Sequence, residues 1–206
     1  MPTKFALFDA DKTLFSGDSL IAFYWFGLKK RPFCILLLPL IPIAALLMVC
    51  KILPIEWFKA LFYAPIGAFN DLDFEEFFNT CLLPRRIPKS WESLLDAKEK
   101  GYHVLVVSAS PEAYLLPLLR RGLCDGVIGS PLRYRNGRYS PLASGKNCAK
   151  QEKVRRILAY CNEHNLSIDF DNSIGFSDSD RDRFMLDLVH TRTRVTKAGE
   201  HIPYEI

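Results

Sequence analysis

The feature that most constrains this chain is a short apolar run that ends in two closely spaced carboxylates. Residues 5–8 are all apolar, and Asp9 and Asp11 follow directly. A continuous apolar run of this length is typical of a strand that is buried on both faces of a parallel sheet. Because ligands of open α/β sheets bind beyond the carboxyl ends of the strands, both carboxylates are predicted to lie where a ligand binds.

The spacing of these two carboxylates indicates a bound cation. Side chains two residues apart in an extended segment point the same way, so Asp9 and Asp11 are expected to repel each other. A hard divalent ion such as Mg²⁺ relieves that repulsion, since it takes oxygen ligands and keeps open positions for a substrate phosphate. Acidic residues also occur at strand ends without a catalytic role, so the motif needs support from the rest of the chain.

The rest of the chain alternates predicted strands with predicted helices. The predicted strands are 102–107, 127–129, 172–176 and, as the last one, 192–196. The predicted helices are 90–100, 112–121, 151–163 and 183–188. Asn136-Gly137 predicts a tight hairpin turn. This alternation predicts an α/β fold, with a mostly parallel, Rossmann-like sheet and helices on both of its faces.

One stretch departs from the α/β pattern. The residues from Pro32 to Cys50 contain no charge, and a second, less regular apolar segment follows at 52–69. We therefore predict an inserted, apolar helical cap at 16–85. The catalytic core is then formed by residues 1–15 together with 86–206.

The uncharged run is close to the length of about 20 residues that a membrane-spanning helix needs. A single span would separate Asp9 from the acidic residues near position 178, and Pro39 and Pro42 would interrupt a straight helix. We expect instead a re-entrant or interfacial hairpin, whose basic neighbours face anionic headgroups. These basic residues are Lys29, Lys30, Arg31, Lys51 and Lys59. The alternative is an apolar cap that packs on its own core or on a second copy.

Composition restricts the partners and the compartment. The formal net charge is +4 and no long run of Lys and Arg occurs, so no nucleic-acid partner is expected. The six cysteines are scattered without a C-x-x-C pair, which predicts free thiols in a reducing compartment. Because the predicted catalytic strand begins so near the first residue, we expect no cleaved signal peptide.

Four groups of polar residues at or just after predicted strand ends have the chemistry of phosphoryl transfer from a monoester. They are Asp9 with Asp11, Ser108, Lys153, and Asp178 with Asp182. One carboxylate can form an aspartyl-phosphate, while a second protonates the leaving oxygen and then activates water. A hydroxyl and backbone N–H groups at a helix start suit a phosphate. A lysine adds positive charge, and a further acid completes a metal shell.

The order and spacing of these groups resemble the haloacid dehalogenase-like hydrolase superfamily, in its subclass with a helical cap after the first motif. DADKT at 9–13 is similar to the first motif, and VLVVS at 104–108 to the second. GKNCAKQEKV at 145–154 is similar to the third, and GFSDSDRD at 175–182 to the fourth. Lys12 stands where glycine is commonest in the superfamily.

The resemblance implies a nucleophile, an acid and a metal site. Asp9 is expected to be the nucleophile and Asp11 the general acid and base. Mg²⁺ is expected to bind the carboxylates of Asp9 and Asp178 and the backbone carbonyl of Asp11. Asp182 would support the metal shell or the catalytic lysine.

The resemblance also implies the residues that hold the phosphoryl group. They are Ser108, the neighbouring Ala109 and Lys153, and the lysine also offsets the charge of the nucleophile. Two other lysines of the third motif compete with Lys153 for this role, Lys146 and Lys150.

The insert narrows the resemblance further. The basic residues 29–31, the Leu/Pro/Ile-rich run after them and RVTKAGE at 194–200 are similar to the bacterial phosphatidylglycerophosphatase C family. That family removes the terminal phosphate from phosphatidylglycerophosphate to give phosphatidylglycerol. The resemblance implies a Mg²⁺-dependent lipid phosphatase at the cytoplasmic face of a bacterial inner membrane.

Two alternatives stay open. One is a cytoplasmic phosphatase of a small monoester such as phosphoserine, with an apolar cap that serves oligomerisation. The other is a membrane-binding module that has lost catalysis. A separate hypothesis is that Arg192, Arg194 and Lys197 contact a second headgroup phosphate, although a solvated basic edge strand is the commoner explanation.

Overall fold

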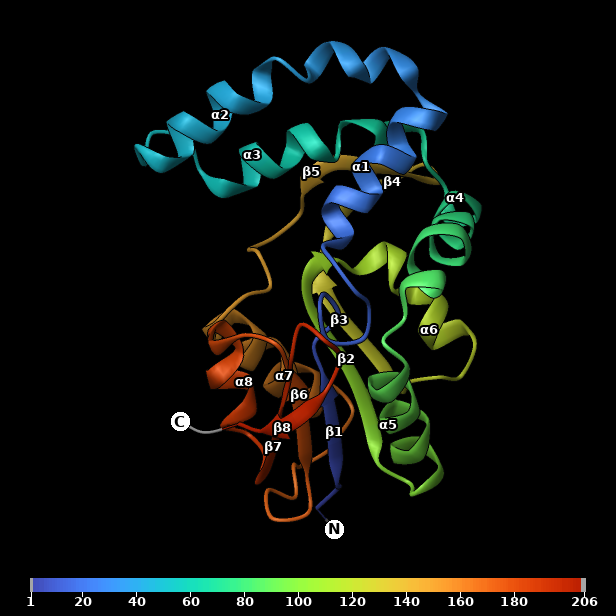
Figure 1. Ribbon diagram of the computed structural model, residues 1–206, viewed down its shortest axis with the longest axis vertical. Helices are drawn as coiled ribbons and strands as arrows, with labels where there is room; N and C mark the ends of the chain where they lie inside the picture. Colours follow the sequence, from blue (N-terminus) through green and yellow to red (C-terminus); the bar gives the residue numbers. More distant parts are fainter. Residues whose placement is uncertain (1, 205–206) are drawn as a thin grey trace.

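The computed structural model describes residues 2–204, and a six-stranded sheet lies at its centre (Figure 1). The strand order is β3-β2-β1-β6-β7-β8. Neighbouring strands run parallel, except that β8 is antiparallel to β7. The strands are β1 Phe5–Phe8, β2 His103–Pro111, β3 Gly126–Ser130, β6 Ile174–Ser177, β7 Thr191–Val195 and β8 His201–Pro203. The predicted α/β fold with a mostly parallel sheet is confirmed.

Strand β1 lies in the middle of the sheet because its side chains are apolar on both faces. Phe5 and Leu7 pack into the apolar core on one face, and Ala6 and Phe8 into the core on the other. All four are completely buried. A register slip of one residue would exchange the two sets, so this burial fixes where Asp9 leaves the sheet.

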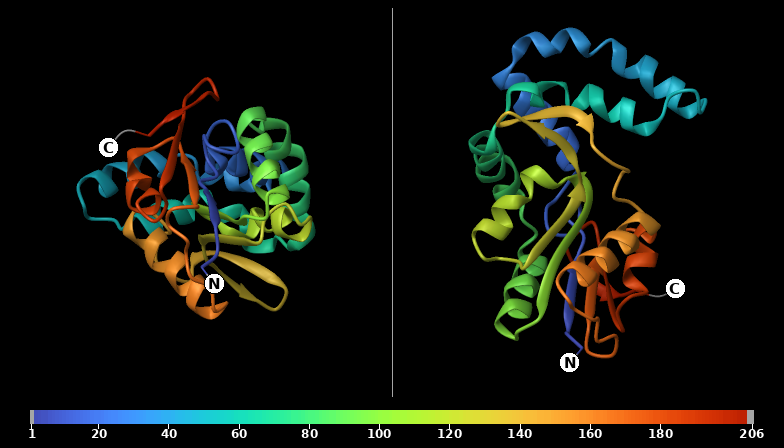
Figure 2. Two further views of the ribbon diagram at one scale, coloured as in Figure 1. Left: turned by 90° about the horizontal axis from the view of Figure 1, so that it is seen from below. Right: turned by 180° about the vertical axis from the view of Figure 1, so that it is seen from behind.

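Helices cover both faces of the sheet (Figures 1 and 2). The helices on the Ala6 and Phe8 face are α5 Pro88–Glu99 and α6 Leu116–Arg120. The helices on the Phe5 and Leu7 face are α7 Gln151–Glu163 and α8 Arg183–Leu186. The predicted helix 112–121 is divided, because a 3-10 turn, Glu112–Tyr114, precedes α6.

The prediction that the strand near 192–196 is the last one is wrong. The chain turns back at Gly199, whose φ of +80° suits glycine, and returns antiparallel to β7 as β8. Strand β8 is only three residues long. A segment this short shows too little alternation for its sequence to predict a strand.

The residues between β1 and α5 form a helical layer beyond the carboxyl end of the sheet, at the top of Figure 1. Its helices are α1 Ser19–Lys30, α2 Leu40–Val49, α3 Ile55–Phe62 and α4 Asp71–Phe77, with 3-10 helices at Pro32–Leu37 and Ala64–Ala68. Helix α3 runs back beside α2 (Figure 1), which is the predicted helical hairpin. Among residues 2–204, no helix combines the length and the apolar character that a membrane crossing requires.

A hairpin from the second half of the chain packs against this helical layer. Strands β4 Leu132–Arg135 and β5 Arg138–Ala143 are joined by Asn136 and Gly137, both with the positive φ that such a tight turn requires. The hairpin turn is thus confirmed. The Tyr139 hydroxyl of β5 donates to Asp71 of α4. The sequence did not predict this packing, because Tyr139 and Asp71 are far apart in the chain.

Aromatic rings join the helical layer to the sheet. Phe23 of α1 stacks on Tyr114 of the core, with ring centroids 5.6 Å apart, and meets Phe77 of α4 edge-on at 5.1 Å. Phe77 also meets Tyr114 edge-on. These rings are buried, so the helical layer and the sheet share one apolar core.

Gly27 allows α1 to approach the segment after α3. A Cβ at this position would lie 2.5 Å from Cβ of Pro65, which is closer than real contacts allow. We expect Gly27→Ala to lower the free energy of unfolding by about 1–3 kcal/mol through this overlap, although alanine favours helices. Urea denaturation measures the change. Gly67→Ala is the matched control, since its Cβ would meet nothing closer than 3.9 Å. A Gly27→Ala variant as stable as the parent chain would contradict the argument.

Candidate active site

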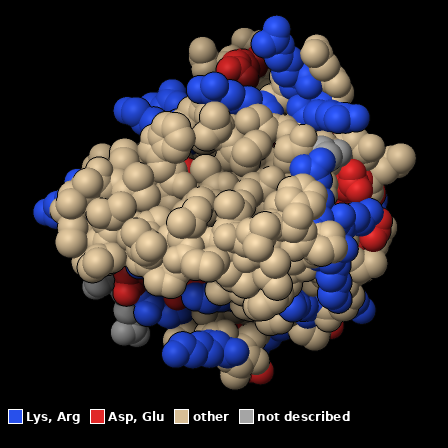
Figure 3. Space-filling view, turned by 90° about the horizontal axis from the view of Figure 1, so that it is seen from above, with Lys and Arg blue, Asp and Glu red and all other residues tan. Residues whose placement is uncertain are grey.

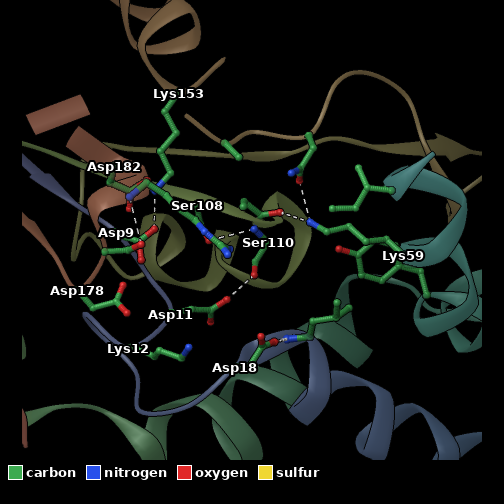
Figure 4. Close-up of a pocket in the computed structure, with 18 residues that line it drawn as sticks. Asp9, Asp11, Lys12, Asp18, Lys59, Ser108, Ser110, Lys153, Asp178 and Asp182 are labelled. Carbon is green, nitrogen blue, oxygen red and sulfur yellow. Dashed lines mark hydrogen bonds and ion pairs between the residues drawn. The ribbon is translucent and has the colours of Figure 1, made fainter. Parts of the chain in front are cut away.

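A cavity of about 280 Å³ opens beyond the carboxyl ends of β1, β2 and β6, and Lys59 of α3 reaches it from one side (Figure 4). The sequence-predicted site residues all line it: Asp9, Asp11, Ser108, Ala109, Lys153, Asp178 and Asp182. They come from segments separated by up to 173 positions, from Asp9 to Asp182. The fold therefore brings the four predicted motifs to one place.

Lys153 joins two of the carboxylates. Its Nζ lies 2.6 Å from Oδ1 of Asp9 and 2.8 Å from Oδ1 of Asp182, and all three side chains are buried. Burial raises the pKa of Asp9 to about 7, although the ammonium of Lys153 acts in the opposite direction. Burial alone would lower the pKa of Lys153, but Asp9 and Asp182 raise it above its usual value. Lys153 therefore carries a positive charge at the floor of the cavity.

The geometry selects one of the three competing lysines. Lys153 lies on the inner face of α7 and reaches Asp9, whereas Lys146 and Lys150 are exposed. Neither of these two lines the cavity. Asp182 also accepts a hydrogen bond from Ser177 Oγ at 2.8 Å, which holds its carboxylate toward Lys153.

Asp11 is surrounded by hydroxyl groups that the sequence analysis missed. Its carboxylate accepts hydrogen bonds from the backbone N–H and the hydroxyl of Ser19, at 3.0 and 2.9 Å, and from Ser110 Oγ at 2.7 Å. Ser19 also lies within hydrogen-bond distance of the Tyr114 hydroxyl. Burial raises the pKa of Asp11, while the hydrogen bonds from Ser19 and Ser110 lower it. The serines, and not Asp9, are the direct neighbours of this carboxylate.

Ser108 lies in an irregular part of β2. The ladder with β1 ends at Val106, and the register with β3 shifts between Val107 and Pro111. The strand thus continues to Pro111, four residues beyond the predicted end at 107. The hydroxyl of Ser108 accepts a hydrogen bond from the backbone N–H of Ser110. Residues 108–110 therefore belong to an irregular, bulged part of β2 beside the cavity. The sequence suggested instead that a helix begins here.

Asp178 is the fourth of the predicted carboxylates that line the cavity. It is half-buried, burial raises its pKa, and Lys12 lowers it. Its backbone N–H donates to Thr13 Oγ1 of the first motif. Within residues 2–204 its carboxylate accepts no hydrogen bond from another residue. Of the two carboxylate oxygens of Asp9, Lys153 contacts only Oδ1.

These oxygens have the chemistry that Mg²⁺ prefers. No group of three Asp, Glu, His or Cys side chains in the described chain forms a metal site. The metal ligands expected from the sequence are not a group of this kind. They are two carboxylates, Asp9 and Asp178, and one backbone carbonyl, that of Asp11. Hard oxygen donors on carboxylates with raised pKa values fit a divalent cation, since a cation stabilises their charged form.

A cation from the helical layer also enters the cavity. Lys59 of α3 donates from Nζ to the carbonyl of Ala109 at 3.0 Å and to Oδ1 of Asn147 at 2.7 Å. The expectation that Lys59 faces lipid headgroups is therefore wrong. The sequence contains one sign of this inward position. Ile55, Lys59 and Tyr63 are spaced by four residues, which puts them on one face of a helix, and all three line the cavity.

A family model for haloacid dehalogenase-like hydrolases matches residues 6–187. The chain belongs to this family. A search of the curated proteins found no similar sequence. The family assignment agrees with the four motifs that converge on the cavity.

Solved structures share the fold. A protein of unknown function from Bordetella pertussis Tohama I has 21% identity and a TM-score of 0.73, over 93% of this chain and 89% of that one. A phosphoserine phosphohydrolase-like protein from Francisella tularensis SCHU S4 has 18% identity and a TM-score of 0.59, over 92% and 86%. A phosphoserine phosphatase solved as a phospho-aspartyl intermediate analogue has 14% identity and a TM-score of 0.58, over 93% and 86%.

The buried ion pairs predict a large stability effect at Lys153. Lys153→Met would leave Asp9 and Asp182 buried without their cation, so we expect the free energy of unfolding to fall by about 3–5 kcal/mol. Urea denaturation at pH 7 measures the loss. Lys150→Met is the control at the position directly before the same helix, where an exposed lysine is worth about 0.5 kcal/mol or less. Equal stability of the two variants would contradict the assigned ion pairs.

Proposed function

We propose that this protein hydrolyses phosphate monoesters through an aspartyl-phosphate on Asp9. The observation that carries this proposal is the convergence of Asp9, Asp11, Ser108 and Lys153 on one cavity. A buried carboxylate beside a fixed ammonium, with a second carboxylate in a separate hydroxyl network, matches the needs of this reaction. Membership of a hydrolase family agrees with it.

The proposed reaction has two steps. Asp9 attacks phosphorus, a new bond forms between its carboxylate oxygen and phosphorus, and the bond to the leaving oxygen breaks. Asp11 gives its proton to that oxygen, and the raised pKa of the buried Asp11 favours the protonated form that this step needs. Asp11 then takes a proton from water, which attacks phosphorus, releases inorganic phosphate and restores Asp9.

The other residues of the cavity bind and orient the phosphoryl group. Lys153 and Ser108 are placed to contact its oxygens, and the backbone at Ala109 continues the same surface. Mg²⁺ is proposed as the cofactor, held by Asp9, Asp178 and the carbonyl of Asp11. When bound, it supplies the charge that screens the nucleophile from the phosphate. Asp182 is a positioning residue, since it acts through Lys153.

We further propose that residues 16–85 act as a cap on a catalytic core of 1–15 and 86–206. Ile55 and Lys59 of α3, and Tyr63 directly after it, line the cavity. The cap therefore supplies part of the surface that a substrate's leaving group meets. Such a surface gives the cap a direct influence on substrate choice.

The outer side of the cap supports a membrane surface as its partner. Figure 3 shows a broad face without charged residues, bordered mostly by Lys and Arg and at a few points by Asp and Glu. We call it the apolar outer face, and define it by exposed side chains of the run and the turn after it: Phe33, Ile35, Leu36, Leu40, Ile43, Leu46, Val49 and Ile52. An apolar face with a basic border complements the interface of an anionic bilayer. The charge of Lys30 is partly balanced within the protein, because Lys30 forms ion pairs with Asp73 and Glu76 of α4.

A lipid monoester is the substrate that we propose, with phosphatidylglycerophosphate as the specific choice. Ile55 is exposed and also lines the cavity, and it begins the helix that runs back beside α2 (Figure 1). We propose that a headgroup phosphate at a bilayer surface reaches Asp9 along this side of the helix pair. The product would be phosphatidylglycerol, at the cytoplasmic face of a bacterial inner membrane.

A small monoester such as phosphoserine is the second candidate. The fold similarity to phosphoserine phosphatase is the observation that favours it. In that case the apolar outer face would bind a second copy of the chain.

Phosphate release by the full-length protein tests the proposed reaction. With Mg²⁺, we expect release from phosphatidylglycerophosphate in mixed micelles to exceed release from phosphoserine in buffer. Asp9→Asn removes the nucleophile and should lower the rate by about a thousandfold or more. Removal of divalent ions with EDTA should also stop release, and added Mg²⁺ should restore it. Equal rates for Asp9→Asn and the parent protein would contradict the mechanism, and a preference for phosphoserine would contradict the lipid substrate.

Sedimentation with vesicles that contain phosphatidylglycerol tests the membrane partner. Leu36→Glu places a charge on the apolar outer face, so we expect the partition coefficient to fall by about tenfold or more. Leu72→Glu on α4 is the matched control, because Leu36 and Leu72 are both 77% exposed and only Leu36 belongs to that face. Equal vesicle binding by the two variants would contradict a bilayer partner. A stable soluble dimer of the parent protein that does not bind vesicles would contradict it as well.

A further inference from the structure

Lys59 is a cation in the catalytic cavity that has only neutral partners. Its Nζ donates to the carbonyl of Ala109 and to the amide oxygen of Asn147. No ion pair within residues 2–204 includes Lys59. Lys153, which also lines the cavity, has two carboxylate partners. The side chain is partly buried, and a buried ammonium with neutral partners is incompletely compensated. An anionic ligand group would complete its environment.

The surroundings allow Lys59 to turn toward such a ligand. Ser130 Oγ lies 2.8 Å from the Ala109 carbonyl and 3.0 Å from Oδ1 of Asn147. Its hydroxyl can therefore donate to one of these two acceptors when Lys59 leaves them. One of the two contacts of Lys59 is thus replaceable by the Ser130 hydroxyl.

The position of Lys59 points to the leaving-group side of the cavity. In Figure 4, Asp11 and Ser110 lie between Asp9 and Lys59. In the proposed reaction Asp11 protonates the leaving oxygen, so the leaving group extends from phosphorus past Asp11. A group attached a few bonds beyond that oxygen would then approach Nζ of Lys59.

We propose that Lys59 binds an anionic group on the leaving group, and so selects phosphomonoesters that carry a second negative charge beyond the scissile bond. This inference rests on the proposed phosphatase function. Two sources can supply that charge, the phosphodiester of a lipid headgroup or the carboxylate of a small molecule. Phosphatidylglycerophosphate has a phosphodiester in its leaving group, and phosphoserine has a carboxylate in its own.

Matched substrate pairs test the role of Lys59. In the lipid pair, phosphatidylglycerophosphate has an anionic leaving group, whereas phosphatidic acid releases neutral diacylglycerol. In the soluble pair, phosphoserine carries a carboxylate that phosphoethanolamine lacks. The measured quantity is the preference, which is the ratio of kcat/KM for the anionic member to kcat/KM for its partner, with Mg²⁺ present. The pair in which the parent protein shows the larger preference identifies the source of the charge.

Three variants separate recognition from structure. Lys59→Met removes the charge and should lower the preference by about 10- to 100-fold, the range for hydrogen bonds to charged groups. Lys59→Arg keeps the charge and should hold the preference within about threefold of the parent value. Lys146→Met removes an exposed lysine outside the cavity and should leave the preference unchanged. Thermal unfolding and vesicle sedimentation of each variant exclude general damage.

The outcomes distinguish this inference from the proposed function. An unchanged preference in Lys59→Met, with release well above the Asp9→Asn blank, would overturn the role of Lys59 and leave the phosphatase intact. Binding gives a readout without turnover, by calorimetric titration of Asp9→Asn with soluble glycerophosphoglycerophosphate and glycerol 3-phosphate. Adding Lys59→Met should weaken binding of the first ligand by at least tenfold more than the second. Equal weakening of both ligands would also overturn the inference, even if no substrate were hydrolysed.

Discussion

The organisation of this molecule depends on one buried ammonium group between two carboxylates. Lys153 contacts Asp9 and Asp182, and none of the three side chains has appreciable access to water. Buried charges are stable only beside opposite charges, so each of these residues requires the others. They belong to α7, the end of β1 and the segment after β6, and their contacts therefore hold three distant segments at one point.

The two carboxylates of the first motif are only two residues apart, yet their surroundings differ. Asp9 meets a cation, whereas Asp11 accepts hydrogen bonds from Ser19 and Ser110. Different environments give neighbouring acids different proton affinities, which is how one site can contain both a nucleophile and a proton donor. Ser19 begins α1, so the cap also takes part in setting the surroundings of Asp11.

The helical layer that we propose as a cap has three surfaces with different chemistry. Aromatic rings such as Phe23 face the core, an apolar outer face meets solvent, and one side of α3 lines the cavity with Lys59. Helix α3 belongs to the same hairpin as α2, which carries part of the apolar outer face, so one helix pair contributes both to that face and to the cavity lining. The proposed membrane contact and the proposed selection of anionic leaving groups therefore depend on the same helix pair.

The sequence by itself determined the features that depend on neighbouring residues. The apolar run of β1, the Asn136-Gly137 turn and the interruption of the uncharged run near Pro39 follow from local sterics and burial, and their positions were predictable. The mostly parallel sheet and the motif residues of the candidate site were predictable too, because parallel strands bring their carboxyl ends to one edge. Only the tertiary structure decided the partners of Asp11, the choice of Lys153 among three lysines and the inward direction of Lys59. Those depend on contacts between different elements of the fold, and a side chain's spacing along its own element does not specify which residue lies opposite it.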